Sequence, residues 1–170
     1  MSVFTTLTLP EVQDCLQDFS IGEMTELRGI AAGVTNTNYF VITETSRYVL
    51  TIFEANTIDE LPYFVDLMTH LADHDIPCPA PIADKHGVAL REIKGKPALL
   101  VSCLQGSDVS APDAEQCARV GRVLAQMHLA GNTFDQQSKN QRDAAWRSHT
   151  AAQVMDKVSA GDQALLQQVL

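Results

Sequence analysis

A short polar loop between two apolar runs has the clearest chemical potential in this sequence. Residues 33–38 read Gly-Val-Thr-Asn-Thr-Asn and are followed by the apolar run Tyr39-Phe40-Val41-Ile42. Gly33 allows a backbone to approach a ligand closely, while the backbone N–H groups and the short polar side chains of residues 34–38 offer hydrogen-bond donors. Such a loop at the tip of two strands suits a phosphate chain. An ordinary hairpin with a glycine-containing turn stays open as the alternative, because this signal is weak.

Histidines and a tryptophan are the other candidates for chemistry. His70 and His74 have a helical spacing that can hold zinc, but no third ligand is evident in the sequence, so a solvated helix end is preferred. The run Asp73-His74-Asp75 is interpreted as a polar helix terminus rather than a metal cluster. His128 is expected to be a hydrogen-bonded structural residue on the inner face of its helix. Trp146 is expected to pack between helices rather than to stack on a substrate.

Composition indicates a globular protein and excludes several classes of partner. The chain has 170 residues, of which 45% are hydrophobic, and this length allows a real core. Its net charge of -9 argues against bulk binding of nucleic acid or of an anionic membrane surface. The N-terminus lacks the features of a secretory signal, and no stretch approaches the ~20 apolar residues of a membrane span. The four cysteines form no Cys-x-x-Cys pair and predict buried free thiols in a reducing, cytoplasmic compartment: Cys15, Cys78, Cys103 and Cys117.

Hydrophobic periodicity predicts a β-rich first part of the chain. Thr8 and Glu11 have the spacing of a capping box, and the apolar pattern that follows extends a helix as far as Gly22. Pro62 is tolerable only in the first turn of the next helix. The later expected elements are strands at 25–31, 38–43 and 47–53, a helix at 59–74, an extended connection at 76–81, short strands at 82–83 and 88–90, a turn at 94–96 and a strand at 97–104 that is buried on both faces.

A polar, turn-like segment at 105–110 marks the expected boundary between two parts. Ser110 is expected to cap a long helix with Pro112 and Asp113 in its first turn and Gly131 as its C-cap. We therefore expect domains at 1–104 and 111–170 joined by a linker at 105–110. A polar loop at 132–143 and helices at about 143–158 and 162–170 complete the pattern. The inner stripe of the long helix is expected to consist of Cys117, Val120, Gly121, Leu124, Met127 and His128.

Several of these segments, in this order, resemble the aminoglycoside phosphotransferase and choline kinase family, and within it most closely the bacterial homoserine kinases. The resemblance spans roughly residues 27–134. It implies an α+β, protein-kinase-like fold of two lobes, with a β-rich N-terminal lobe that binds a nucleotide and the first helices of an incomplete helical C-terminal lobe. The segments that carry the resemblance are 33–41, 48–54, 61–64, 95–98 and 127–131.

The resemblance also implies an activity. It implies an ATP-dependent phosphotransferase that uses Mg²⁺ and a small hydroxyl substrate, with L-homoserine converted to O-phospho-L-homoserine on the way to threonine. Catalysis in such enzymes is mostly positioning and charge stabilisation. Two alternatives stay open: another small-molecule kinase of the same fold, of choline or aminoglycoside type, and a non-catalytic nucleotide-binding or interaction module.

The resemblance assigns nucleotide-binding roles to particular residues. Val49 would pack on the adenine, Glu60 would be the acidic residue of the helix behind the phosphate site, and Thr51 stands where protein kinases place a lysine. Residues 33–38 would cover the phosphates: Gly33, Val34, Thr35, Asn36, Thr37 and Asn38. The joint between the lobes would include Ser102, Cys103 and Leu104.

The catalytic elements of the family do not occur in these residues. The His-x-Asp motif followed by Asn is missing, as is the later metal-binding Asp, so the sequence offers no catalytic residue and no metal ligand. His74-Asp75 lacks the following Asn and precedes a proline-rich turn. We therefore expect residues 1–170 to be catalytically inert by themselves. We also expect the last helices to expose apolar faces through which the chain self-associates.

Overall fold

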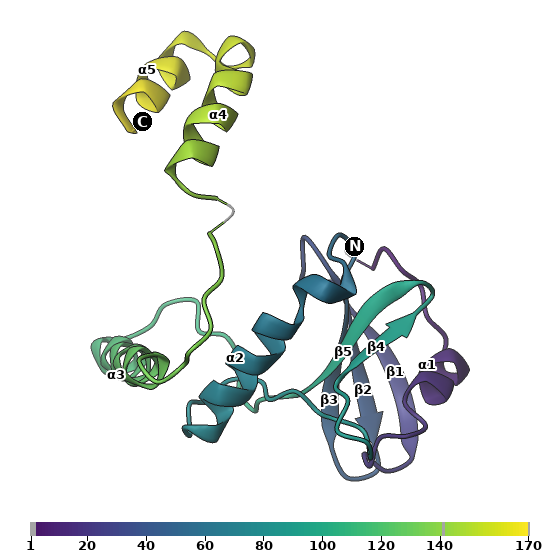
Figure 1. Ribbon diagram of the computed structural model, residues 1–170. Helices are drawn as coiled ribbons and strands as arrows, with labels where there is room; N and C mark the ends of the chain where they lie inside the picture. The colour runs from purple at the N-terminus through teal and green to yellow at the C-terminus, as the bar shows by residue number, and fades with distance from the viewer. Residues whose placement is uncertain (1–2, 141, 170) are drawn as a thin grey trace. The chain divides into compact units, whose positions relative to one another are not determined.

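Five antiparallel strands form the sheet on which the first part of the structure is built (Figure 1). The computed structural model describes residues 3–140 and 142–169. The strand order is β1-β2-β3-β5-β4, and each neighbouring pair is antiparallel. The predicted strands at 25–31, 38–43, 47–53 and 97–104 are confirmed within a few residues. The observed bounds are β1 Met24–Ile30, β2 Thr37–Thr43, β3 Arg47–Ile52, β4 Leu90–Ile93 and β5 Lys96–Ser102.

The strand register gives the sheet two different faces. Side chains alternate across a strand, and in β2 every second residue from Thr37 to Thr43 is buried while those between are half-exposed. We call the side that carries Tyr39, Leu50 and Leu100 the core face. The other side of β2 and β3 is called the open face, where Phe40 pairs with Val49 and Asn38 pairs with Thr51.

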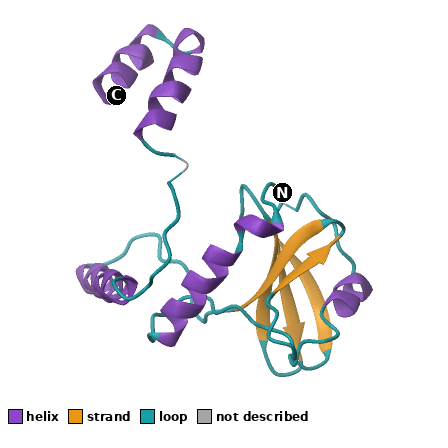
Figure 2. Cartoon of the chain, viewed as in Figure 1, coloured by secondary structure: helices purple, strands orange, loops and turns teal. Residues whose placement is uncertain are grey.

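The N-terminal segment and helix α1 (Leu9–Cys15) cover the core face (Figure 2). Burial of these apolar side chains supplies the main driving force for folding of this part. Tyr39 extends the contact, since its hydroxyl donates to the Thr5 carbonyl at 2.9 Å and accepts the Leu7 N–H at 2.9 Å. The core includes Leu7, Val12, Leu16, Phe19, Ile21, Tyr39, Val41, Leu50, Ile52, Ala98 and Leu100.

The predicted capping box of α1 is confirmed. The Thr8 N–H donates to Glu11 Oε2 at 2.8 Å, and Lys94 Nζ lies 2.9 Å from Glu11 Oε1. The Thr8 backbone hydrogen bond, followed by the one from Lys94, lowers the pKa of Glu11 to about 2. The expected extension of this helix to Gly22 is wrong. It ends at Cys15, because the chain turns there and Leu16 and Phe19 reach the core from a turn rather than from a helix.

Helix α2 (Pro62–Asp73) begins later than predicted. Pro62 occupies its first turn, as expected, but residues 58–60 form the separate 3₁₀ turn η1 (Ile58–Glu60). The turn at Lys94-Gly95 is confirmed, since both residues have positive φ angles, 53° and 72°. The hairpin turns of this kind favour left-handed backbone at both central positions.

The predicted short strands at 82–83 and 88–90 are wrong. Asp84 closes a turn instead: its buried carboxylate accepts the His86 and Val88 N–H groups at 2.8 Å each and pairs with Arg91. The backbone N–H groups that would pair with a neighbouring strand therefore bind to the Asp84 side chain instead. The strand β4 starts only at Leu90.

Helix α3 (Ala114–Gly131) starts at a different cap and buries a different stripe from those predicted. Asp113 replaces Ser110 as its N-cap, because its carboxylate accepts the Gln116 N–H at 2.8 Å, and the C-cap is Asn132 rather than Gly131. The helix packs on α2 near Leu71 and Ile76 through Val123, Met127 and Ala130. Of the predicted inner stripe, only Met127 is even partly buried, whereas Cys117, Val120, Gly121, Leu124 and His128 are exposed. Helix α2 covers only a narrow stripe of α3, so the other predicted positions stay exposed.

The second compact unit, Gln137–Leu170, contains two helices and a short turn. The predicted helices are confirmed as α4 (Ala144–Val154) and α5 (Ala160–Val169), joined through η2 (Met155–Lys157). Trp146 is 42% exposed beside Arg142, so its expected packing between helices is wrong.

The described helices include none that is long and apolar enough to cross a membrane. All four cysteines are free, but three are half-buried and Cys117 is exposed, so burial of the thiols was only partly correct.

Two leucines provide a matched test of this packing. Leu50 is 1% exposed in the core, whereas Leu129 is 69% exposed on α3. We expect Leu50→Ala to lower the free energy of unfolding by about 2–5 kcal/mol, because it removes buried methyl groups and leaves a cavity. Leu129→Ala should change it by less than about 0.5 kcal/mol. Urea unfolding followed by circular dichroism measures both, and equal losses would contradict this assignment of the core.

Candidate functional site

The polar segment 33–38, which runs from the loop after β1 into the first two residues of β2, has an exposed first half and an anchored second half. Val34 is 95% exposed and Thr35 is also exposed, whereas Thr37 is completely buried. Gly33, Asn36 and Asn38 are half-buried. The sequence predicted that residues 34–38 would all offer donors beside Gly33, but the structure places the two halves in different environments.

Three consecutive polar residues anchor the second half of the loop. Thr37 Oγ1 accepts the N–H groups of Phe4 at 2.9 Å and Thr5 at 3.0 Å. Asn36 Oδ1 accepts the Glu54 N–H at 3.4 Å, and Asn38 Oδ1 accepts the Thr51 hydroxyl at 2.8 Å. These side chains are therefore engaged within the protein, where they fix the position of the loop.

A partly buried ionic cluster behind the loop completes this anchor. We call Thr5, Thr37, Glu54 and Lys96 the Glu54 cluster. The Glu54 carboxylate accepts the hydroxyls of Thr37 at 2.5 Å and Thr5 at 2.8 Å and forms an ion pair with Lys96. Burial favours a raised pKa for Glu54, but the hydrogen bonds from Lys96, Thr37 and Thr5 together outweigh it and lower that pKa. The Glu54 side chain is only 13% exposed, so the cluster is a fixed support.

The exposed first half of the loop offers backbone donors. The N–H groups of Gly33, Val34 and Thr35 form no hydrogen bond with any residue that the structure describes, and neither does the Thr35 hydroxyl. Successive unpaired N–H groups in a turn can form an anion-binding concavity. The backbone N–H groups at the tip of the loop are thus free, whereas the side chains at its base form hydrogen bonds within the protein.

An aromatic residue that sequence reasoning missed lies beside the predicted adenine contact. Phe40 pairs with Val49 across the open face, and the guanidinium groups of Arg28 and Arg47 lie 5.3 Å and 5.0 Å from its ring centre. The alternation of β2 was readable in the sequence, but the residue opposite Val49 depends on the strand register. A flat apolar surface with flanking cations suits a planar ligand.

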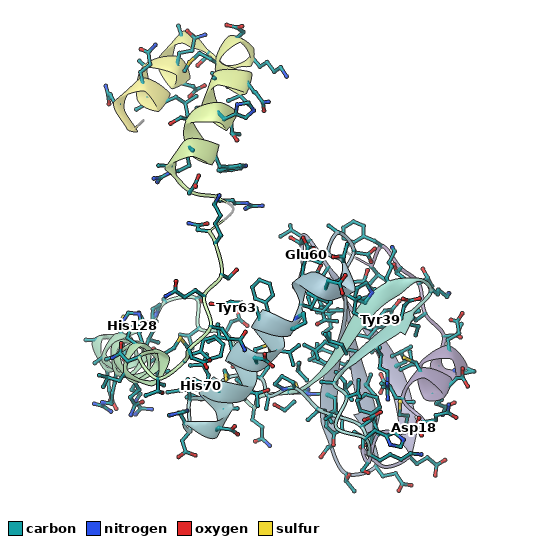
Figure 3. The ribbon with its side chains drawn as sticks, in the orientation of Figure 1. Asp18, Tyr39, Glu60, Tyr63, His70 and His128 are labelled. Atoms are coloured by element: carbon teal, nitrogen blue, oxygen red, sulfur yellow. The ribbon has the colours of Figure 1, made fainter. Side chains whose placement is uncertain are left out.

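Two predicted positions differ from the kinase pattern. Thr51 carries no charge, and its hydroxyl is bound to Asn38. Lys96 does not replace the missing lysine there, because it joins the Glu54 cluster on the core face. Glu60 does not lie on the helix that the resemblance implied (Figure 3). It ends η1, where its carboxylate accepts the Thr57 N–H at 3.0 Å.

The predicted joint follows the end of β5. Ser102 is bound twice to Ala80, through its N–H and its hydroxyl, at 2.8 Å in each case. The N–H groups of Cys103 and Leu104 have no partner among the described residues. The Leu104 side chain is exposed. This segment therefore presents free backbone donors next to the open face.

The described residues contain no group of three or more His, Cys, Asp or Glu side chains that could hold a metal ion. His70 Nε2 lies 2.9 Å from the Ala130 carbonyl, and its ring is tilted against that of Phe134, so His70 joins α2 to the end of α3 rather than pointing into solvent. His74 is exposed, as expected for a helix end. His128 is exposed on α3, so its expected structural role is wrong (Figure 3).

Comparison with protein families and curated proteins gives a consistent result. Residues 26–170 match the model of the phosphotransferase enzyme family. The chain is 52% identical over 154 residues to a homoserine kinase of Methylobacillus flagellatus, covering 91% of this chain and 48% of that protein. It is 48% identical over 172 residues to a homoserine kinase of Cupriavidus necator, covering 99% and 52%. The chain thus spans about half the length of the curated relatives that it matches.

Solved structures share the fold at low sequence identity. Spectinomycin phosphotransferase in complex with ADP and spectinomycin superposes with a TM-score of 0.66 at 14% identity, over 92% of this chain and 50% of that one. Amicoumacin kinase in complex with AMP-PNP and Ca²⁺ gives 0.63 at 17% identity, over 80% and 43%. The expected α+β kinase-like fold is confirmed, with coverage of about half of each neighbour. The predicted boundary at 105–110 stays a prediction.

The Glu54 cluster predicts a specific dependence of stability on pH. Glu54→Gln should lower the free energy of unfolding at pH 7 by about 1.5–3 kcal/mol, because it removes charged hydrogen bonds and leaves Lys96 without its partner. The folded-state pKa of Glu54 lies below its ordinary 4.5. Its stabilisation is therefore complete above the unfolded-state pKa and is lost as the pH falls through the lower, folded-state pKa.

Urea unfolding of both proteins between pH 7 and pH 3 measures this effect. The difference between the wild type and Glu54→Gln should shrink below the ordinary pKa of 4.5. Glu26→Gln is the control, because Glu26 is half-exposed and lies 3.9 Å from Arg28; exposed pairs contribute little. A difference that is the same at every pH would show that the charge of Glu54 is not what matters.

Proposed function

Because this chain belongs to the phosphotransferase enzyme family, we propose that it is the nucleotide-binding part of an ATP-dependent homoserine kinase. The observation that carries ATP binding is the loop tip, whose unpaired N–H groups at residues 33–35 stand on a rigid base. The substrate is proposed because relatives at 42–52% identity bear the name homoserine kinase.

The proposed reaction transfers the γ-phosphoryl group of ATP to the hydroxyl of L-homoserine. The hydroxyl oxygen forms a bond to the γ-phosphorus, the bond from that phosphorus to the bridging oxygen breaks, and ADP leaves while the hydroxyl gives up its proton. Such transfers depend mainly on in-line positioning and on stabilisation of charge. In this chain the N–H groups of Gly33, Val34 and Thr35 bind phosphate oxygens, and Asn36, Thr37 and Asn38 hold those donors in place.

The base of the nucleotide rests on the open face in this proposal. Phe40 and Val49 provide the apolar contact, and the free N–H groups of Cys103 and Leu104 meet the edge of the adenine. Because Thr51 stands where protein kinases have a lysine, the backbone donors of the loop provide a larger share of the contacts with the phosphates. Mg²⁺ is proposed as well, but the described residues contain no cluster that would hold it, and we assign no step to it.

Other readings have specific support too. A kinase of aminoglycoside type is the second candidate, since the solved neighbours include spectinomycin phosphotransferase. A nucleotide-binding module without activity is the third.

We further propose that the protein works in the cytoplasm, where ATP is supplied. Self-association stays a prediction; exposed apolar residues include Leu165 on α5 and Val120 on α3, and sedimentation velocity would measure it.

Val34 offers a precise test of the loop, because its side chain is exposed and its N–H is unpaired. Val34→Pro removes that N–H, and Val34→Ala keeps it. We expect Val34→Pro to weaken ATP binding about ten-fold or more in calorimetry, which corresponds to the loss of one charge-assisted hydrogen bond. Val34→Ala should bind like the wild type. Equal ATP affinity of both variants would remove the loop from the nucleotide site.

The substrate is tested with the purified protein and with any longer gene product that carries these residues. ADP release is measured with ATP and L-homoserine, choline or an aminoglycoside as the acceptor. We expect turnover with homoserine in a product that contains a catalytic loop and none in residues 1–170 alone. Turnover with choline or an aminoglycoside, but not with homoserine, would reject the proposed substrate.

A further inference from the structure

A hollow of about 660 Å³ opens where β3 begins and β5 ends. Its walls are formed by the turn before β3 and by the segment that follows β5. Its lining includes Thr45, Ser46, Arg47, Ser102, Cys103 and Gln105. We propose that this hollow, here called the hinge hollow, binds a small oxyanion with a phosphate or carboxylate head group, and that Arg47 is the residue that holds it.

Arg47 is the unpaired cation of the sheet region. Among the described residues up to 104, every other lysine and arginine forms an ion pair: Arg28 with Glu26, Lys85 with Asp18, Arg91 with Asp84, Lys94 with Glu11 and Lys96 with Glu54. The whole chain has a net charge of -9, so carboxylates are abundant. A cation that stays without a carboxylate in such a protein is available for an external anion.

Arg47 is exposed, and its guanidinium makes two contacts with the protein. Its Nε donates to Cys103 Sγ at 3.2 Å, and its Cζ lies 5.0 Å from the centre of the Phe40 ring. These two contacts restrict the side chain but leave its two terminal nitrogens without a partner among the described residues. A guanidinium fork matches the two oxygens of a carboxylate or phosphate, and a fork that is already ordered loses less entropy on binding.

Neutral donors surround the same hollow. The side chains of Thr45, Ser46 and Gln105 form no hydrogen bond with any residue in 3–140 or 142–169. Two hydroxyls and an amide can satisfy further oxygen lone pairs of an anion that Arg47 has bound. The hollow therefore combines the positive charge of Arg47 with side-chain donors that form no hydrogen bond among the described residues.

The hinge hollow is separate from the proposed phosphate loop. Arg47 pairs with Ile42 at one end of β3, whereas Thr51 pairs with Asn38 at the other end, next to the loop. Four residues of strand correspond to roughly 13 Å. The hollow shares Cys103 with the proposed adenine contact, but the inference does not rest on the proposed kinase activity, and an anion in the hollow would not occupy the place of the γ-phosphate.

The experiment is a titration of the isotope-labelled chain with inorganic phosphate and, separately, with acetate, followed by amide NMR shifts. We expect saturable shifts at residues 45–47 and 103–106. Arg47→Gln should weaken this binding at least about ten-fold, in line with the loss of a charge-assisted fork. Arg28→Gln is the matched control, since it removes the other guanidinium beside Phe40 but lies outside the hollow, and it should bind like the wild type.

The outcomes separate this inference from the proposed function. A stronger response to phosphate or to acetate identifies the preferred head group, provided that Arg47→Gln abolishes it. Saturable shifts only at residues 33–35, or shifts that persist equally in Arg47→Gln, would overturn the inference. Val34→Pro should leave binding in the hinge hollow intact even where it weakens ATP binding. A wild-type chain that binds the anion in the hinge hollow but does not bind ATP would therefore contradict only the kinase proposal.

Discussion

The ion pair of Glu54 with Lys96, together with the hydroxyls of Thr5 and Thr37, is the constraint on which the candidate site depends. It joins the N-terminal segment, the start of β2, the second residue after β3 and the start of β5. A largely buried carboxylate is costly to leave unpaired, so its contacts hold the four segments together. The tip of the loop stays open with free N–H groups, while these contacts hold its base.

Strand geometry explains how a row of similar residues divides its tasks. Side chains along a strand alternate between the two faces, so Thr37 enters the core face while Asn38 lies on the open face beside Thr51. In the sequence, the run from Asn36 to Asn38 reads as a set of ligand donors. In the structure these side chains form hydrogen bonds within the protein, and the free donors are the backbone N–H groups of residues 33–35, which precede them.

Local signals predicted the fold well, and long-range pairing explains the errors. The Thr8–Glu11 box, the place of Pro62 and the turn at Lys94-Gly95 depend on neighbouring residues and are confirmed. The end of α1 and the buried stripe of α3 depend on what packs against them, which periodicity alone does not reveal. Phe40 and Arg47 gain their importance from the strand register and from distant partners, so no local pattern could have identified them. The nucleotide-binding roles of the loop and joint residues stay predictions.

The attachment of the amino end gives it an influence far from its place in the chain. The N–H groups of Phe4 and Thr5 are donors to Thr37, and the Lys94 ammonium contacts the Thr6 carbonyl at 2.8 Å. Proteolytic trimming or a bulky fusion at this end would therefore loosen a hairpin more than 30 residues away. Residues that precede the first helix therefore hold the start of β2 and the loop before it in place.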